Sequence, residues 1–129
     1  MRPNETSYNV IGVALKVHSA LGAGLLESAY DGAFCDGLTK AGLHFQHQVR
    51  LSLTYDGATR FPAYKVDFIV ERCLLVEIKS VTKVLPVHKA QLLSYLRLTG
   101  HKLGLLLNFN VPHMRDGIQR VINAPESEL

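Results

Sequence analysis

The pattern of apolar and polar positions begins with two helical segments. Residues 7–20 and residues 25–40 each place apolar side chains three and four positions apart, which is the spacing of an amphipathic helix. Thr6 is the expected N-cap of the first helix, and Gly42 stands where the second should end. The glycine-rich stretch between the two segments breaks the pattern. The sequence therefore predicts two consecutive helices.

After the second helix the period changes to two, which is typical of strands. Three strands are expected, at residues 44–55, 61–70 and 73–80. The first alternates apolar and polar positions as a half-buried strand does. Tight turns are expected at Asp56-Gly57 and at Glu71-Arg72. The third strand is apolar on both faces except at two charged positions, so we expect it in the middle of a sheet.

The rest of the chain predicts a helix at 87–99 with Pro86 in its first turn, a central strand at 103–109, a short helix at 113–121 and a polar tail. The element order is then ααβββαβα. A strand–helix–strand crossover places two strands in parallel. The expected fold class is α/β, with helices on a mixed sheet of about four strands.

Composition narrows the class of protein. The chain has 129 residues, of which 47% are hydrophobic and 19% charged, so it is not a disordered chain. We expect one domain over residues 1–129 with its core at about 8–122. Cys35 and Cys73 are too few for a disulfide framework and lie in apolar stretches, so they are interpreted as buried thiols. Neither a signal peptide nor a membrane-spanning stretch is evident, and a cytoplasmic location is expected.

The net charge of +3 is unevenly distributed. No acidic residue lies between Glu77 and Asp116, whereas this stretch holds six Lys and Arg residues. Two interpretations stay open, a chance arrangement in a small protein and a surface that faces an anion such as a phosphate backbone.

Three charged residues, Asp67, Glu77 and Lys79, lie inside strands that otherwise form the core. An unpaired buried charge is costly, so such residues need a partner or a metal. Glu77 and Lys79 point to the same face, and the turn before their strand places Asp67 opposite Glu77 or one residue away. Two adjacent carboxylates favour a hard cation such as Mg²⁺. The alternative is a buried ion pair of Lys79 with one carboxylate.

The same residues carry a family resemblance. Asp67, nine further residues and then Glu77-Ile78-Lys79 resemble the D…ExK core of the PD-(D/E)xK nuclease superfamily. Val66 stands where the motif's name has Pro, a common departure. Short acidic patterns of this kind recur by chance, so the resemblance depends on further motifs.

Two further motifs agree, in the expected order. Gln91-Leu92-Leu93-Ser94-Tyr95 resembles the QxxxY motif of RecB-like members, and residues 24–30 match the GxxExxY signature of a small family within the superfamily. The resemblance covers residues 8–122 and implies a central mixed sheet flanked by helices, as in restriction endonucleases.

The resemblance also implies the roles of individual residues. The expected catalytic residues are Asp67, Glu77, Lys79 and Gln91. The expected ligands of Mg²⁺ or Mn²⁺ are Glu27, Asp67 and Glu77. We expect substrate contacts from Lys83, His88, Lys89 and Tyr95. His18 and Tyr30 are expected to support the site from behind.

Several of these residues have plainer interpretations. Glu27 stands in the first turn of its helix, where the helix dipole favours a negative charge. Tyr30 and Tyr95 have rings that suit the core, and His18 suits a polar helix position. His44 and His47 lack a third metal ligand at a recognisable spacing, so they are interpreted as strand residues.

The sequence thus predicts a metal-dependent nuclease acting on nucleic acid, with DNA expected before RNA. The alternative is a non-catalytic module that binds nucleic acid or a protein partner on the same fold. The short chain leaves little room for a separate DNA-reading element, so a homodimer is also expected.

Overall fold

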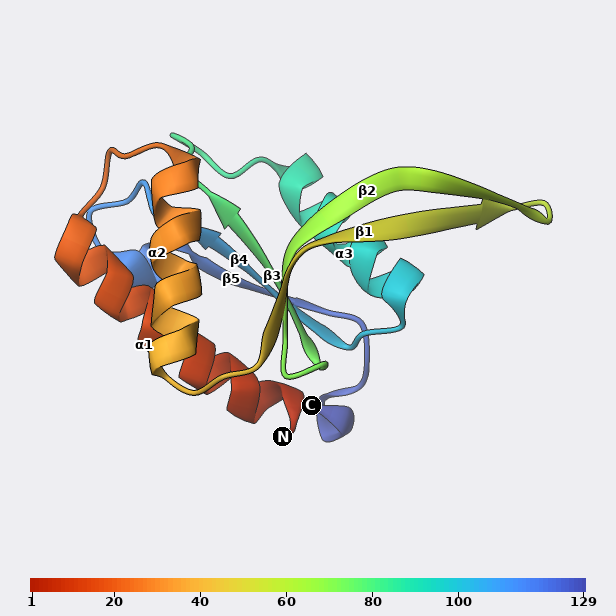
Figure 1. The fold of residues 1–129 in the computed structure, drawn as a ribbon, viewed down its shortest axis with the longest axis horizontal. Coiled ribbons are helices and arrows are strands. Elements are labelled where there is room, and N and C mark those ends of the chain that lie inside the picture. The colour runs from red at the N-terminus through yellow and green to blue at the C-terminus, as the bar shows by residue number, and fades with distance from the viewer.

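The computed structural model describes residues 1–60 and 64–129 with their side chains (Figure 1). The helices are α1 (Pro3–Leu21), α2 (Glu27–Lys40) and α3 (Pro86–Thr99). The strands are β1 (Phe45–Tyr55), β2 (Ala58–Val70), β3 (Leu74–Lys79), β4 (Leu103–Asn108) and β5 (Ile118–Ile122). Two short 3-10 turns complete the chain, η1 (Met114–Gly117) and η2 (Glu126–Glu128). The expected start of the second strand at residue 61 lies outside the described residues.

The strands form one mixed sheet in the order β1-β2-β3-β4-β5, so the sheet has five strands where about four were expected. β3 and β4 run parallel and are joined by α3, which confirms the predicted crossover. The other neighbours pair antiparallel. The α/β fold class and the central positions of β3 and β4 are confirmed.

The predicted helix at 113–121 is wrong. Only Met114–Gly117 forms a single 3-10 turn, and Ile118–Ile122 continues as β5, antiparallel to β4. β4 is buried along its whole length, so its outer edge needs a strand to satisfy its backbone hydrogen bonds. The backbone hydrogen bonds that β5 makes with β4 outweigh the weak helical spacing of the nine residues 113–121.

The predicted N-cap at Thr6 is also wrong. α1 begins at Pro3, because proline suits the first position of a helix and its missing N–H would be unpaired there in any case. Thr6 is fully buried in the second turn, and its Oγ1 accepts a hydrogen bond from the Cys73 thiol at 3.2 Å. The chain ends against the same helix, where the Asn4 N–H donates to the carbonyl of the buried Leu129.

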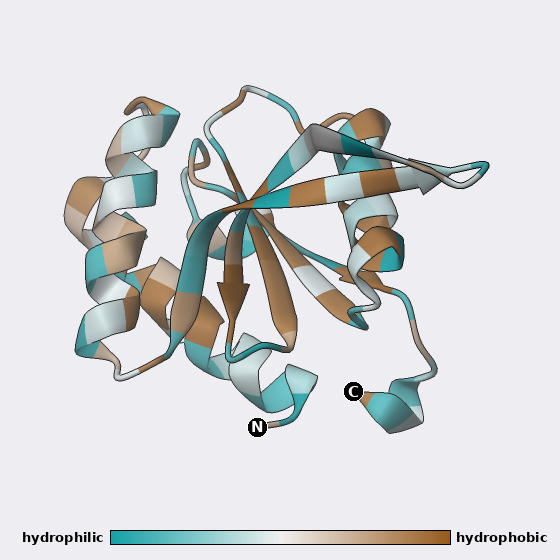
Figure 2. Cartoon of the chain, turned by 45° about the vertical axis from the view of Figure 1, so that its right-hand side comes forward, coloured by the Kyte–Doolittle hydropathy of each residue, from teal (hydrophilic) through white to brown (hydrophobic). Residues whose placement is uncertain are grey.

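The two faces of the sheet carry separate apolar clusters. α1 and α2 cover one face, where Phe34 and Phe68 meet edge to face with their ring centroids 5.0 Å apart. α3 covers the other face through Leu92 and Leu96. The strands at the centre of the sheet are correspondingly hydrophobic, whereas the tip of the β1–β2 hairpin is hydrophilic (Figure 2). This layering is expected, because the central strands are apolar on both faces whereas each helix is apolar on one side.

The β1–β2 hairpin extends beyond the rest of the sheet as a two-stranded arm (Figure 1). Within the described part of β2, only Phe68–Val70 pairs with β3. Along β1 the buried face changes, because Phe45 packs with the α1–α2 cluster whereas Val49 and Leu51 pack with the α3 cluster. The change occurs at Gln48, whose φ of 55° is left-handed. The expectation of one regular half-buried strand is therefore corrected.

Candidate active site

Asp67 and Glu77 lie where β2 separates from β3. The last ladder pair is Phe68 with Val76, so the register places Asp67 directly across from Glu77, the first of the two arrangements left open by the sequence. The two side chains replace the missing backbone ladder. The Asp67 N–H donates to Glu77 Oε1 at 2.9 Å, and the Ile78 N–H donates to Asp67 Oδ2 at 2.8 Å. The site is therefore built by the divergence of two strands.

Both carboxyl groups of the pair have raised pKa values. Glu77 is only 6% exposed, and burial, reinforced by the charge of Asp67, raises the pKa of its carboxyl to about 8. Burial also raises the pKa of Asp67, although the hydrogen bond from Ile78 opposes the shift. A buried acid and a half-buried acid that both resist ionisation indicate a place for positive charge.

Glu27 and Lys79 lie close enough to this pair to interact with it electrostatically. Partial burial raises the pKa of Glu27, with the Lys79 ammonium opposing the shift and Asp67 adding to it. Glu27 opens α2, and the Ser80 hydroxyl just after β3 donates to the Leu25 carbonyl at 2.6 Å. That bond joins the start of α2 to the end of β3, and Figure 1 shows these two ends close together. Sequence-distant acids are thereby brought to one place.

The loop before Glu27 is fixed by Tyr30. Its hydroxyl donates to the Gly22 carbonyl at 2.6 Å and accepts from the Leu25 N–H at 3.1 Å. The ring is fully buried and stacks on Phe109 with a centroid separation of 4.7 Å. Tyr30 therefore packs in the core and supports the loop, as the plainer interpretation of this residue had it.

His18 links α1 to the segment that follows β4. Its Nε2 lies 2.8 Å from the carbonyl oxygen of Val111, in the segment that follows β4. Among the described residues it makes no hydrogen bond to Asp67, Glu77 or Lys79.

The two QxxxY residues lie on α3. Tyr95 is 5% exposed, with its ring centroid 5.7 Å from that of Tyr64 on β2. Burial, with a contribution from the charge of Glu77, raises the pKa of its hydroxyl to about 12, so the hydroxyl stays protonated. Gln91 is exposed and lines, with both tyrosines, a groove of about 620 Å³ between α3 and the arm. No hydrogen bond joins Gln91 to the carboxylates in the described part of the chain.

The residues expected to contact substrate lie at or before the start of α3. His88 is already engaged, because its Nδ1 accepts the Leu85 N–H at 3.0 Å and so caps the helix. Lys83 and Lys89 are exposed, and neither forms an ion pair with a residue that the structure describes. They contribute positive charge at this end of α3.

Two functional positions were missed by the sequence reasoning. Gln48 places its Nε2 3.4 Å from Asp67 Oδ1 and 3.4 Å from Asp31 Oδ2, so it bridges two acids. Buried Asn108 binds the N–H and the carbonyl of Val81 and so fixes the chain that leaves β3. An Asn at the end of an apolar strand was a usable signal, but nothing in the alternation of β1 marks Gln48.

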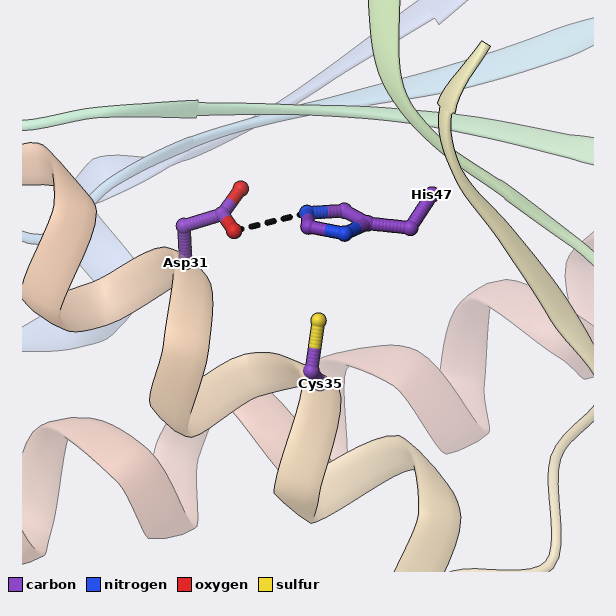
Figure 3. A group of neighbouring side chains, drawn as sticks. All are labelled: Asp31, Cys35 and His47. Carbon is purple, nitrogen blue, oxygen red and sulfur yellow. Dashed lines mark hydrogen bonds and ion pairs between the residues drawn. The ribbon is translucent and has the colours of Figure 1, made fainter.

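His47 lies on β1, as expected, and its side chain also has neighbours that the sequence did not indicate. Its Nε2 lies 2.7 Å from Asp31 Oδ1, and Cys35 lies beside both (Figure 3). One ligand atom from each of the three lies within 4.8 Å of the others. Cys35 is half-buried rather than buried. The partners come from a helix 12 to 16 positions earlier, which no local spacing in the sequence reveals.

The Asp67–Glu77 pair fits a hard divalent cation. Each carboxylate gives one oxygen to a backbone N–H, and this leaves a second oxygen. The second oxygen of Asp67 has only the long contact with Gln48, and that of Glu77 accepts no hydrogen bond from any described residue. Carboxylate oxygens are the donors that Mg²⁺ and Mn²⁺ prefer. Glu27 lies within electrostatic reach of Glu77, and Asp31 lies within electrostatic reach of Asp67.

Comparison with family models gives a match over residues 4–121 to the model described as the PD-(D/E)XK nuclease superfamily. The chain belongs to the PD-(D/E)XK nuclease superfamily. This nuclease-like chain gives no match among curated proteins, and none among solved structures. Among its described helices, none has both the length and the apolar character needed to cross a membrane.

Proposed function

We propose that this PD-(D/E)XK chain is a metal-dependent nuclease that hydrolyses phosphodiester bonds of nucleic acid. One observation carries the proposal, namely the pair of carboxyl groups that faces across the diverging β2 and β3, each held by the other strand's backbone. Asp67 and Glu77, together with Glu27, would hold Mg²⁺ or Mn²⁺. When bound there, the ion supplies Lewis acidity and lowers the pKa of a coordinated water.

The remaining chemistry belongs to side chains of the chain itself. Lys79 follows Glu77 by two positions on the same face, so its ammonium can orient the attacking water and offset charge on a phosphoryl oxygen. It makes no ion pair within 4.0 Å with any described residue and is therefore free for that task. Gln91 can donate to a phosphate oxygen from α3, while Tyr95 offers a hydroxyl that remains a donor at neutral pH.

The groove between α3 and the arm supplies a path for the substrate. Tyr64 and Tyr95 line it with aromatic surface, and Arg97 lines it with positive charge. Aromatic faces stack on bases and cations attract the phosphate backbone. Lys83, His88 and Lys89 extend the basic surface at the start of α3. We therefore propose nucleic acid as the substrate, with DNA before RNA.

The second candidate function is a non-catalytic module that binds nucleic acid or a protein on the same fold. The raised pKa of Glu77 favours catalysis over this alternative. Burial destabilises the ionised form of its carboxyl group, and a bound cation would stabilise that form. A pure binding surface has no use for that arrangement. Calorimetric titration separates the two, because the module predicts no Mg²⁺ or Mn²⁺ binding that depends on Asp67.

Cleavage of labelled DNA and RNA by the purified protein tests the proposal. We expect cleavage with Mg²⁺ or Mn²⁺ and none with a chelator. Glu77→Gln and Lys79→Met should each reduce the rate at least about 100-fold, as removal of one transition-state contact does. Glu77→Gln keeps the shape of a neutral acid, so the fold should persist. The exposed residues Glu5 and Lys16 on α1 give the matched controls Glu5→Gln and Lys16→Met.

Cleavage that survives both site variants would come from another enzyme in the preparation and would overturn the assignment. Binding of nucleic acid without cleavage of any tested substrate, and without Mg²⁺ or Mn²⁺ binding that depends on Asp67, would favour the non-catalytic module instead.

A further inference from the structure

A second cluster of metal-ligating side chains lies beside the Asp67–Glu77 pair and contains neither of its acids. Asp31 and Cys35 are four residues apart on α2, so they share one face of the helix. His47 reaches the same place from β1 (Figure 3). One ligand atom from each lies within 4.8 Å of the others. Three different donor types thus converge from two elements.

We propose that Asp31, Cys35 and His47 form a second metal site, selective for Zn²⁺ and separate from the Mg²⁺ site of the proposed nuclease. Thiolate and imidazole are ligands of borderline and soft metals, and a carboxylate completes many zinc sites. Mg²⁺ prefers oxygen donors and water, so the sulfur and nitrogen of this cluster disfavour it. The donor set therefore separates the two metals by chemistry.

The spacing of the cluster is close to that of a zinc site. Zinc–ligand bonds of about 2.0–2.3 Å place neighbouring ligand atoms about 3.3–3.8 Å apart in a tetrahedron. Asp31 Oδ1 and His47 Nε2 are 2.7 Å apart and share a hydrogen atom. Replacing that hydrogen by a cation needs a small separation of these two groups and an approach of Cys35. A water molecule would complete the tetrahedron.

The cluster is reachable from solvent yet held in place. The side chains of His47 and Asp31 are 35% and 19% exposed. The His47 ring stacks on Phe68 with a centroid separation of 4.6 Å, which fixes its orientation. An ordered imidazole loses little further freedom when it binds a metal, so the site is preorganised.

Occupation of the site would reach the nuclease centre through Gln48. The Gln48 amide lies 3.4 Å from His47 Nε2, from Asp31 Oδ2 and from Asp67 Oδ1. A metal at the cluster would pin the base of the β1–β2 arm to α2 beside that amide. A metal bound there would therefore hold Gln48 in place beside Asp67.

Titration of the full chain with Zn²⁺ alone, without nucleic acid, tests the site. We expect one equivalent to bind, with Cys35→Ser and His47→Ala each weakening it by more than about 100-fold, since loss of an outer-shell partner alone costs 10–100-fold. Co²⁺ in place of Zn²⁺ should give a thiolate-to-metal absorption band that Cys35→Ser removes. Cys73→Ser and His44→Ala are matched controls, because each removes the same donor type outside the cluster.

Zn²⁺ binding that persists in Cys35→Ser, or that is lost equally in Cys73→Ser, would overturn the proposal. Loss of the Zn²⁺ equivalent in Glu77→Gln, with retention in Cys35→Ser and His47→Ala, would also overturn it by placing zinc at the carboxylate pair. Because the readout is metal binding, the result stands apart from whether the protein cleaves nucleic acid.

Discussion

Glu77 is an acid in the middle of a buried strand, and its ionisation is tied to its neighbours. The Asp67 and Glu27 carboxyl groups raise its pKa, whereas Lys79 and the N–H of Asp67 lower it; burial dominates and brings the value to about 8. A residue that packs like a neutral side chain in the metal-free protein would become a ligand when a cation is present. The energetics of this one residue thus link folding to function.

The free energy of unfolding of the metal-free protein should fall as pH rises from about 5 to 8. Between an unfolded pKa near 4.5 and a folded pKa near 8, the folded state binds one more proton than the unfolded state. The stability that Glu77 contributes is therefore full below the lower value and lost through the upper one, with a slope of up to about 1.4 kcal/mol per pH unit. Urea unfolding at several pH values with a chelator measures this slope.

Glu77→Gln should flatten most of that slope, with a remainder from Asp67 and Glu27, whose pKa values are also raised. Glu5→Gln on the exposed face of α1 should leave it unchanged. A Glu77→Gln protein with the same pH dependence as the parent would contradict the assigned burial of the acid.

At the scale of single elements, the turns and the strand ends can be tested separately. The turn between β2 and β3 places both Glu71 and Arg72 in the left-handed region, with φ of 50° and 55°. The other hairpin uses Asp56-Gly57, a pair that adopts this geometry at less cost. The β2–β3 turn therefore carries strain that its sequence does not relieve.

Arg72→Gly should stabilise the protein by about 0.5–1 kcal/mol. Relief of a left-handed non-glycine residue is worth about 1–2 kcal/mol, and the greater freedom of glycine in the unfolded chain offsets part of it. Arg50→Gly, at a paired position of β1, should destabilise the protein instead. Glycine there makes the unfolded chain more flexible, and no left-handed strain is relieved in the folded state. Thermal unfolding of both variants gives the comparison, and equal signs for the two would refute the strain.

Asn108→Ala should destabilise by about 2–4 kcal/mol. Its buried amide satisfies the N–H and the carbonyl of Val81, and both would lose their partner inside the protein at about 1–3 kcal/mol each. Exposed Asn9 on α1 supplies the control Asn9→Ala. A denaturant midpoint unchanged from the parent would show that the chain after β3 is held by other contacts.

The sequence predicted most elements of the fold because their periods are long and clean. The helices at Glu27–Lys40 and Pro86–Thr99 and the central strands β3 and β4 lie within two residues of their expected positions. The segment 113–121 failed because nine residues carry too little periodicity to distinguish a helix from an edge strand that β4 requires. The pairing of Asp67 with Glu77 followed from strand order, whereas its exact register depended on the turn.

The parts of the site that could not be predicted depend on distant contacts. The pairing of β1 with β2 places Gln48 across from Asp67, and the Gln48 amide also reaches Asp31 on α2. His47 lies beside Cys35 because α2 packs against the base of the β1–β2 hairpin. Periodicity within a segment holds no information on such meetings.

At the scale of the whole molecule, the arm and α3 frame the groove, and Tyr95 on its wall lies within electrostatic reach of Glu77 and Asp67. The match to the nuclease family covers residues 4–121, nearly all of the described fold. We therefore expect further substrate contacts to come from a second copy of the chain. Light scattering after size exclusion should therefore give a mass near twice the chain's 14.3 kDa. A mass equal to one chain across the working concentration range would refute the homodimer and leave each site to act alone.

We infer that the Asp67–Glu77 pair is a metal-binding nuclease centre, and anomalous diffraction from crystals grown with Mn²⁺ is the decisive measurement. We expect an anomalous peak between the free oxygens of Asp67 and Glu77, absent in crystals of the Glu77→Gln protein. Crystals saturated with Mn²⁺ that show no peak at this pair, or a peak only at Asp31 and His47, would contradict it.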